Sequence, residues 1–320
     1  MAIWPGLPKW AAMTSSLSAS TASDDIVAAF QIETRPARGR IVRLGDAVNE
    51  VLTRHDYPEP VATLLGEACA LAALVGASLK FEGRLIVQAQ GKGPVSYVVA
   101  DYDTSGALRG YCRFDADRVA EVSCGLMLPG ARTLLGDGVF TMTIDPVDMA
   151  DRYQGITAIE GETLALCAEQ YFAQSEQTPT RIRLAVARAG MDRTWRAGCA
   201  MVQIIAGDEA RGDTQDAWDH VQALFETLGE DELVDPNLPP ETLLYRLFHE
   251  DGVRLFPSTP LRAFCRCTQG RVEGMLAAFP EADRADMVEP DGTIHVTCEY
   301  CSRDYRIEPD AVAKVAAQAE

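Results

Sequence analysis

The chain has 320 residues, 47% of them hydrophobic, and a formal net charge of −18. This composition supplies a substantial core and excludes a disordered protein. The negative charge repels phosphate backbones and anionic membrane surfaces, so we expect neither nucleic acid nor a membrane as a partner.

The N-terminal 25 residues contain no apolar stretch of the length that a signal peptide requires, which favours a cytoplasmic protein. We expect residues 1–23 to form a flexible tail, because they are rich in Ser, Thr and Ala. The longest apolar run, 68–79, is too short to span a membrane.

Residues 24–207 mix helical and strand patterns. Two helices are predicted at 44–55 and 59–79, a hairpin around the turn 91–94 with a third strand at 107–114, and a further helix at about 161–175. The stretch "TRIRLAVAR" alternates Ile182, Leu184 and Val186 with less apolar residues, as a half-buried strand does. These patterns predict an α+β fold, a mixed α/β core domain with a largely antiparallel sheet.

Residues 208–258 are acidic and contain several prolines, and we interpret them as a helical linker. Trp218, Val221, Phe225 and Leu228 recur at helical spacing, and a second apolar series follows Pro240. Such helices are marginal alone, so we expect them to dock conditionally on the preceding domain. Once undocked, these four side chains are candidates for binding other exposed apolar chains.

The nine cysteines fall into two groups. Five are isolated among apolar neighbours, and we interpret most of them as small core residues: Cys69, Cys112, Cys124, Cys167 and Cys199. The other four form two close pairs within the C-terminal segment 259–320, Cys265-x-Cys267 and Cys298-x-x-Cys301.

Two close pairs separated by about thirty residues suit a four-thiolate tetrahedral metal site. Soft thiolates without carboxylate or histidine partners favour a closed structural zinc site, with one ion per chain. An iron–sulfur cluster also accepts four thiolates and stays open as an alternative. His295 lies close to Cys298, but we interpret it as a surface strand residue.

The metal and the fold of this segment are expected to depend on each other. Structural zinc contributes about 10–16 kcal/mol of folding free energy, and the segment has few large apolar residues. Between 261 and 308, six arginines face nine acidic residues, so no basic surface for nucleic acid exists there. Thiolates are also oxidisable, and the closely spaced C-x-C pair favours a redox sensor over a permanent structural site.

Long stretches from about residue 24 to 305 resemble the redox-regulated 33-kilodalton heat-shock chaperones, which are ATP-independent holdases. The resemblance rests on "HDYPEPVATLLGEACALAALVGASLKFEGRLIVQAQGKGPV", "YFAQSEQTPTRIRLAVA", "LLYRLFHEDGV" and both cysteine pairs. It implies an inactive, reduced, zinc-bound form and a stress-activated form that binds unfolded proteins, commonly as a homodimer. It also implies that oxidation releases zinc, forms the disulfides Cys265–Cys267 and Cys298–Cys301, and unfolds the switch domain and linker.

Two other functions remain open from the residues. Cys298-x-x-Cys301 could belong to a thiol–disulfide oxidoreductase, although such motifs usually open a helix after a strand. A zinc-ribbon interaction protein without a switch is the second alternative. No catalytic triad or phosphate-binding loop is present, so we predict a protein that is not an enzyme.

Overall fold

The computed structural model describes residues 24–80, 82–125, 128–147, 151–205 and 214–319. The predicted tail at 1–23 and the predicted boundary between 207 and 208 lie outside these ranges. Within them, the strands form two six-stranded sheets and one hairpin. In the described ranges the strands pair antiparallel except for the short pairing of β12 with β5, which confirms the prediction of an α+β fold with largely antiparallel sheets.

Sheet A has the order β10-β1-β2-β9-β8, with β11 also paired to β1. Its strands are β1 (Ile26–Ile32), β2 (Ala37–Leu44), β8 (Thr180–Ala189), β9 (Thr194–Ile204), β10 (Val253–Leu255) and β11 (Thr259–Pro260). Because β10 and β11 come from the predicted linker and C-terminal segments, distant parts of the chain complete this sheet.

Sheet B has the order β12-β5-β4-β3-β6-β7. Its strands are β3 (Gly83–Gly91), β4 (Val95–Asp103), β5 (Ala107–Phe114), β6 (Gly138–Pro146), β7 (Tyr153–Ala158) and β12 (Arg262–Ala263). The predicted hairpin 84–103 and third strand are confirmed, and they form consecutive strands of this sheet.

Helix α2 (Glu59–Gly76) contacts both sheets and forms the centre of the main core, together with α1 (Asp46–Thr53). Its small residues allow close approach: a Cβ on Gly66 would lie 2.7 Å from Val186 Cγ1. By length and composition alone α2 could cross a membrane, but 83% of that stretch is buried in the protein. It is therefore the core helix of this fold.

Three shorter helices complete the part of the chain between β5 and β8. They are α3 (Ala116–Val122), α4 (Ala131–Leu135) and α5 (Leu164–Tyr171), and α5 continues into a π-helical turn, η1 (Phe172–Glu176). The helix predicted at 161–175 is thus confirmed, with its last turn wound more loosely than an α-helix.

The helices of the predicted linker pack against the face of sheet A that α2 does not cover. They are α6 (Thr214–Glu226), α7 (Glu230–Val234) and α8 (Pro240–Phe248), called the linker helices below. Their apolar residues and the inner residues of β1, β2, β8 and β9 form one buried cluster. The predicted alternation of β8 is confirmed, because Ile182, Leu184 and Val186 pack on the main core with α2. On the opposite face Ala185 is also buried, beneath the linker helices, which the alternation did not indicate.

Three arginines of sheet A also hold the linker region, through its backbone carbonyls. Arg43 is fully buried and donates to the carbonyls of Asp235 and Leu238, the latter at 2.9 Å. Arg196 donates to Val234 at 2.8 Å, and Arg183 donates to Leu228 at 3.0 Å. Such carbonyls would otherwise be buried without partners, which costs about 1–3 kcal/mol each.

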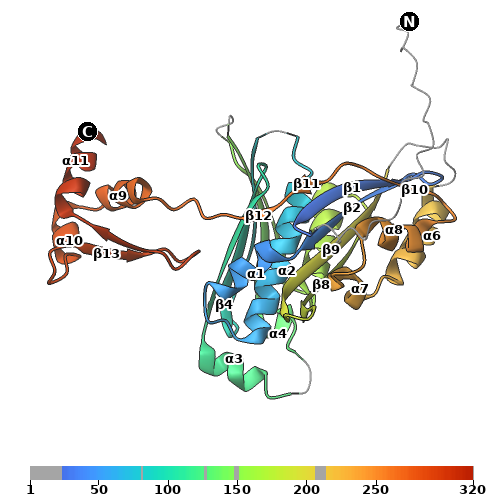
Figure 1. Cartoon of the computed structure of the whole chain (residues 1–320), viewed down its shortest axis with the longest axis horizontal. Coiled ribbons are helices and arrows are strands. Elements are labelled where there is room, and N and C mark those ends of the chain that lie inside the picture. The colour runs from blue at the N-terminus through green and yellow to red at the C-terminus, as the bar shows by residue number, and fades with distance from the viewer. Residues whose placement is uncertain (1–23, 81, 126–127, 148–150, 206–213, 320) are drawn as a thin grey trace, which may run out of the picture.

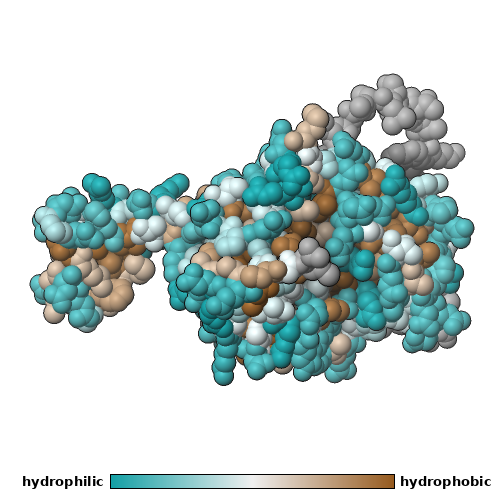
Figure 2. Space-filling model, turned by 90° about the horizontal axis from the view of Figure 1, so that it is seen from below, coloured by the Kyte–Doolittle hydropathy of each residue, from teal (hydrophilic) through white to brown (hydrophobic). Residues whose placement is uncertain are grey.

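The remaining C-terminal residues form a separate small lobe, called the cysteine module (residues 264–319) (Figure 1). It contains α9 (Gln269–Ala277), α10 (Glu281–Asp286), the hairpin β13 (Ile294–Thr297) and β14 (Asp304–Ile307), and α11 (Pro309–Ala319). Figure 1 places the module and the linker helices on opposite sides of the two sheets, and Figure 2 shows the module as a lobe joined to a mainly hydrophilic body.

Candidate metal centre

The four predicted ligands lie together at the point where the cysteine module meets the core. Their Sγ atoms are all within 4.8 Å of one another. Cys265 Sγ lies 3.7 Å from Cys298 Sγ, and Cys267 Sγ lies 3.3 Å from Cys301 Sγ. Four sulfurs at about 2.3 Å from one tetrahedral ion would be about 3.8 Å apart, so the arrangement fits zinc.

Each pair of cysteines comes from a short local segment. Cys265 and Cys267 lie on the extended chain between β12 and α9, where residues two apart face the same side. Cys298 and Cys301 lie in the tight turn between β13 and β14. There the Ser302 amide donates to the Cys298 carbonyl at 2.8 Å, and Ser302 adopts a left-handed φ of 54°.

The surroundings of the four thiols differ. Burial raises the pKa of Cys298, and burial is also the largest cause that raises the pKa of Cys301 to about 12. Burial opposes ionisation of Cys267 too, but hydrogen bonds with Tyr305 and the other cysteines lower its pKa to about 7. A bound cation would hold all four as thiolates, the form that coordinates metal and reacts with oxidants.

The module has little other means of stabilisation. Its buried cluster consists of Val272, Leu276, Ile294, Ile307 and Val312, with a few partly buried neighbours. The main core cluster is many times larger. This contrast agrees with the expectation that metal binding and the fold of the module depend on each other.

Polar contacts connect the turn of Cys298 and Cys301 to the core. Ser302 Oγ donates to the Arg54 carbonyl at 3.0 Å, at the end of α1. Glu299 pairs with Arg113 of β5 at 2.8 Å, and both side chains are exposed. An exposed pair of this kind contributes about 0–1 kcal/mol, so these contacts orient the turn more than they stabilise it.

The structure does not bring the other predicted site residues to this centre. Trp218, Val221, Phe225 and Leu228 are gathered in the cluster under the linker helices and are buried. The prediction that these residues share one docked apolar face is confirmed by their packing, whereas their role in client binding stays a prediction.

The remaining cysteines and His295 lie outside the sulfur cluster. Cys69, Cys112, Cys167 and Cys199 are buried, as expected, but Cys124 is exposed because it follows the end of α3. His295 lies on β13 and contacts Asp291 at 2.8 Å, as a surface strand residue.

Two residues between the predicted ligands were not predicted to matter for this site. Arg266 lies between Cys265 and Cys267, Tyr300 lies between Cys298 and Cys301, and both contact the core. Their positions beside the ligands were the only available signal, since their partners on the core lie far away in the sequence. The contacts of Arg43 could not be predicted either, since the carbonyls that it contacts also lie far away in the sequence.

Comparisons with known proteins agree with this architecture. The family profile described as "Hsp33 protein" matches residues 25–308. The 33 kDa chaperonin of Caulobacter vibrioides is 70% identical over 288 residues, covering 89% of this chain and 95% of that protein. The 33 kDa chaperonin of Azotobacter vinelandii is 38% identical over 294 residues, covering 91% of this chain and 94% of the relative.

One solved structure shares the fold. The crystal structure of a 33 kDa chaperonin from Thermotoga maritima aligns with a TM-score of 0.72 and 22% sequence identity, covering 92% of this chain and 99% of that chain. At this identity the likeness is evidence for the fold alone.

Proposed function

The chain belongs to the Hsp33 family of 33 kDa chaperonins, and we propose that its four clustered cysteines form a zinc-dependent redox switch that controls the chaperone. As a member of this family it is a holdase and not an enzyme. The convergence of four sulfurs within 4.8 Å, on a lobe with a very small apolar core, carries the proposal.

In the reduced state, Cys265, Cys267, Cys298 and Cys301 would hold one zinc ion per chain. Zinc supplies a closed tetrahedral crosslink between the two cysteine motifs and offers no open position for a substrate. The ion would thereby fix the extended segment after β12 to the turn between β13 and β14.

On oxidation, we propose disulfides within each motif, Cys265–Cys267 and Cys298–Cys301. For each disulfide, two thiolates give two electrons to one hydrogen peroxide, which takes up two protons and leaves as two water molecules. The sulfur distances do not select this pairing, because a tetrahedral arrangement places all four sulfurs at similar separations. Both disulfides together remove every ligand of the metal.

Loss of the crosslink would unfold the cysteine module, which makes up most of the proposed switch domain 259–320. It would also loosen the proposed linker 208–258 from the core domain 24–207. Trp218, Val221, Phe225 and Leu228 would then become available to unfolded client proteins, without ATP. We also propose that the oxidised protein forms a homodimer. The compartment that we propose is the cytoplasm, where thiols stay reduced until oxidative stress.

The switch is tested by following zinc and chaperone activity in the same samples. A chromogenic chelator reports zinc during peroxide treatment, and light scattering reports the aggregation of a thermally unfolding client. We expect zinc release and protection of the client to rise together. Zinc release without any gain in protection would reject the switch, and size-exclusion chromatography of the same samples tests the dimer.

An oxidoreductase activity is not favoured by the position of Cys298 and Cys301. They lie in a turn between two strands, not at the N-terminus of a helix, where the helix dipole lowers a thiol pKa. An insulin-reduction assay gives the direct check: catalytic turnover by the reduced protein would contradict the holdase assignment.

A further inference from the structure

In each cysteine motif, one of the residues between the two cysteines contacts the same pair of core residues, Asp101 and Arg109. Arg266, between Cys265 and Cys267, donates from Nη2 to Asp101 Oδ2 at 3.0 Å. Tyr300, between Cys298 and Cys301, lies with its ring centroid 3.9 Å from Arg109 Cζ, in a cation–π contact. The two cysteine motifs therefore contact the core at the same place, the Asp101–Arg109 pair.

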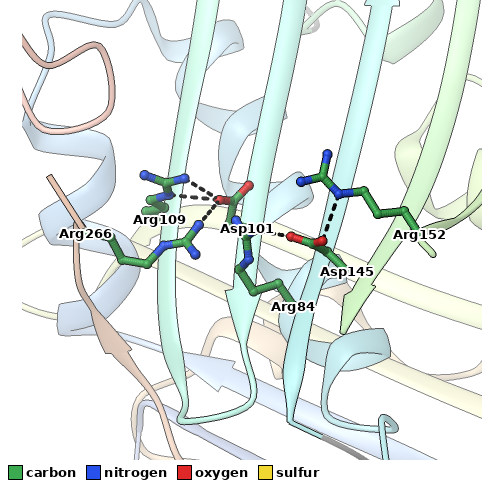
Figure 3. A network of polar contacts seen from close by, with 6 residues as sticks. All are labelled: Arg84, Asp101, Arg109, Asp145, Arg152 and Arg266. Atoms are coloured by element: carbon green, nitrogen blue, oxygen red, sulfur yellow. Dashed lines mark hydrogen bonds and ion pairs between the residues drawn. The ribbon is translucent and has the colours of Figure 1, made fainter. Parts of the chain in front are cut away.

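Asp101 and Arg109 are themselves bound to each other. They are directly opposite on β4 and β5, and Arg109 donates to Asp101 Oδ2 from Nε at 2.9 Å and from Nη2 at 2.6 Å. One carboxylate oxygen thus accepts from two guanidinium groups, one of the core and one of the module (Figure 3). Without this carboxylate, the two arginines would face each other without the acceptor that they share.

The site is largely shielded from water. Asp101 is only 5% exposed, and the side chains of Arg109 and Arg266 are 17% and 21% exposed. Removing one member of a buried ion pair is far more disruptive than removing an exposed one, because the partner charge stays buried and unpaired. Removing Asp101 is therefore expected to be more disruptive than removing a member of the exposed Arg113–Glu299 pair nearby.

Backbone hydrogen bonds to β5 fix the position of the segment that leads to Arg266. Strand β12 pairs in parallel with β5, with Arg262 opposite Ala107 and Ala263 opposite Leu108. The Phe264 amide then donates to the Leu108 carbonyl at 2.9 Å. The chain is thus held along β5 up to the residue before Cys265, and Arg266 extends over the outer face of sheet B toward Asp101 (Figure 3).

We propose that Asp101 is the positioning residue of the metal centre, which acts through Arg266 and through Arg109 with Tyr300 to hold both cysteine motifs in register. This inference rests on the proposed zinc switch and adds the core residue that presents the ligands to the metal. It follows that loosening this site weakens metal binding without changing any cysteine, and that metal loss releases Arg266 and Tyr300 from the core.

The same sheet provides a matched control. Asp145 on β6 also accepts from two arginines on this face, Arg84 and Arg152, the latter at 2.8 Å (Figure 3). Its side chain is nearly as buried as that of Asp101, but neither arginine belongs to the cysteine module. Asp145→Asn therefore removes a comparable bridge and leaves the metal centre in place.

The test compares full-length wild type, Asp101→Asn and Asp145→Asn in the reduced state. Competition with a chromogenic chelator gives the apparent zinc affinity, and stopped-flow measurement gives the rate of zinc release by peroxide. We expect Asp101→Asn to weaken the affinity and speed the release by about tenfold or more, and Asp145→Asn to stay within about twofold of wild type. Equal values for the two variants would overturn the proposal.

A double-mutant cycle guards against a general folding defect of Asp101→Asn. Arg266→Gln changes only the module side of the contact, and combining it with Asp101→Asn should weaken zinc binding by less than the sum of the two single effects. Additive effects would contradict action through Arg266. Wild-type zinc content keeps the two proposals apart: a metal-free, folded wild type rejects the zinc switch, whereas zinc-loaded variants indistinguishable from wild type reject only the role of Asp101.

Discussion

The linker helices and the cysteine module are both attached to the core, but by different forces. The linker helices bury a continuous apolar cluster against sheet A, reinforced by the arginine contacts to their carbonyls. The module contacts sheet B through a few polar side chains and one short parallel pairing, and it protrudes as a lobe (Figure 2). Burial stabilises the first attachment, whereas charged contacts and hydrogen bonds stabilise the second, to which the proposed metal would add.

In the proposed switch, this difference separates the sensing part of the molecule from the client-binding part. A lobe with a very small apolar core would respond sharply to the loss of a single ion, because its apolar packing compensates little. The linker helices would supply the apolar surface for clients, and would need a trigger before they expose it. Three changes test this contrast, from the largest expected effect to the smallest.

The largest effect is expected from Cys298→Ser, which removes one ligand. Because metal binding supplies about 10–16 kcal/mol to such small domains, the module should lose zinc and unfold even when reduced. Zinc content by mass spectrometry and hydrogen exchange in β13 and β14 measure this. Cys124→Ser, at an exposed cysteine outside the centre, should leave both unchanged. Full zinc occupancy in Cys298→Ser would refute the four-ligand site.

A smaller effect is expected from Phe225→Ala, which acts on the linker helices alone. Phe225 is fully buried against sheet A, and truncating such a residue costs about 3–5 kcal/mol. The linker helices should become sensitive to limited proteolysis while the module keeps its zinc. Tyr245→Ala, on the exposed side of α8, serves as the control. If Phe225→Ala also lost zinc, the two attachments would not be separable.

The smallest effect concerns Asp251, which ties α6 to the turn between β1 and β2. Its carboxylate contacts His220 at 2.6 Å, Arg35 at 3.0 Å and Thr34 at 3.1 Å. Burial alone would raise its pKa, but these hydrogen bonds hold the pKa below the usual 3.8. The stabilisation is therefore fully present above about pH 4 and is lost as pH falls through the lowered pKa.

Asp251→Asn should accordingly destabilise the protein by about 1–3 kcal/mol at pH 7, and by progressively less toward pH 3. Urea unfolding at several pH values, with wild type in parallel, measures the difference. A difference that did not change with pH would show that the charge of Asp251 contributes nothing to this contact.

Much of this molecule could be predicted from local patterns. The spacing of Cys298 and Cys301 defines a turn that closes within a few residues. Trp218, Val221 and Phe225 follow one face of α6, and Leu228 joins the same cluster just after the helix ends. Both are short-range properties that neighbouring residues determine. The alternation in β8 correctly indicated the side that packs on the main core, but it gave no sign that Ala185 on the other side is buried, because a strand cannot indicate from its own sequence that a second layer of helices covers it.

The sequence by itself determined which four cysteines come together, the amphipathic helices and the family. Only the tertiary structure decided where these parts attach: Arg266 and Asp101 are separated by 165 positions, and Arg43 is separated from Leu238 by 195. No repeating sequence pattern predicts the partner of a buried arginine or aspartate in a strand, since that partner depends on how the sheets and the module pack together. The core residues that hold the switch are therefore visible only in the folded molecule.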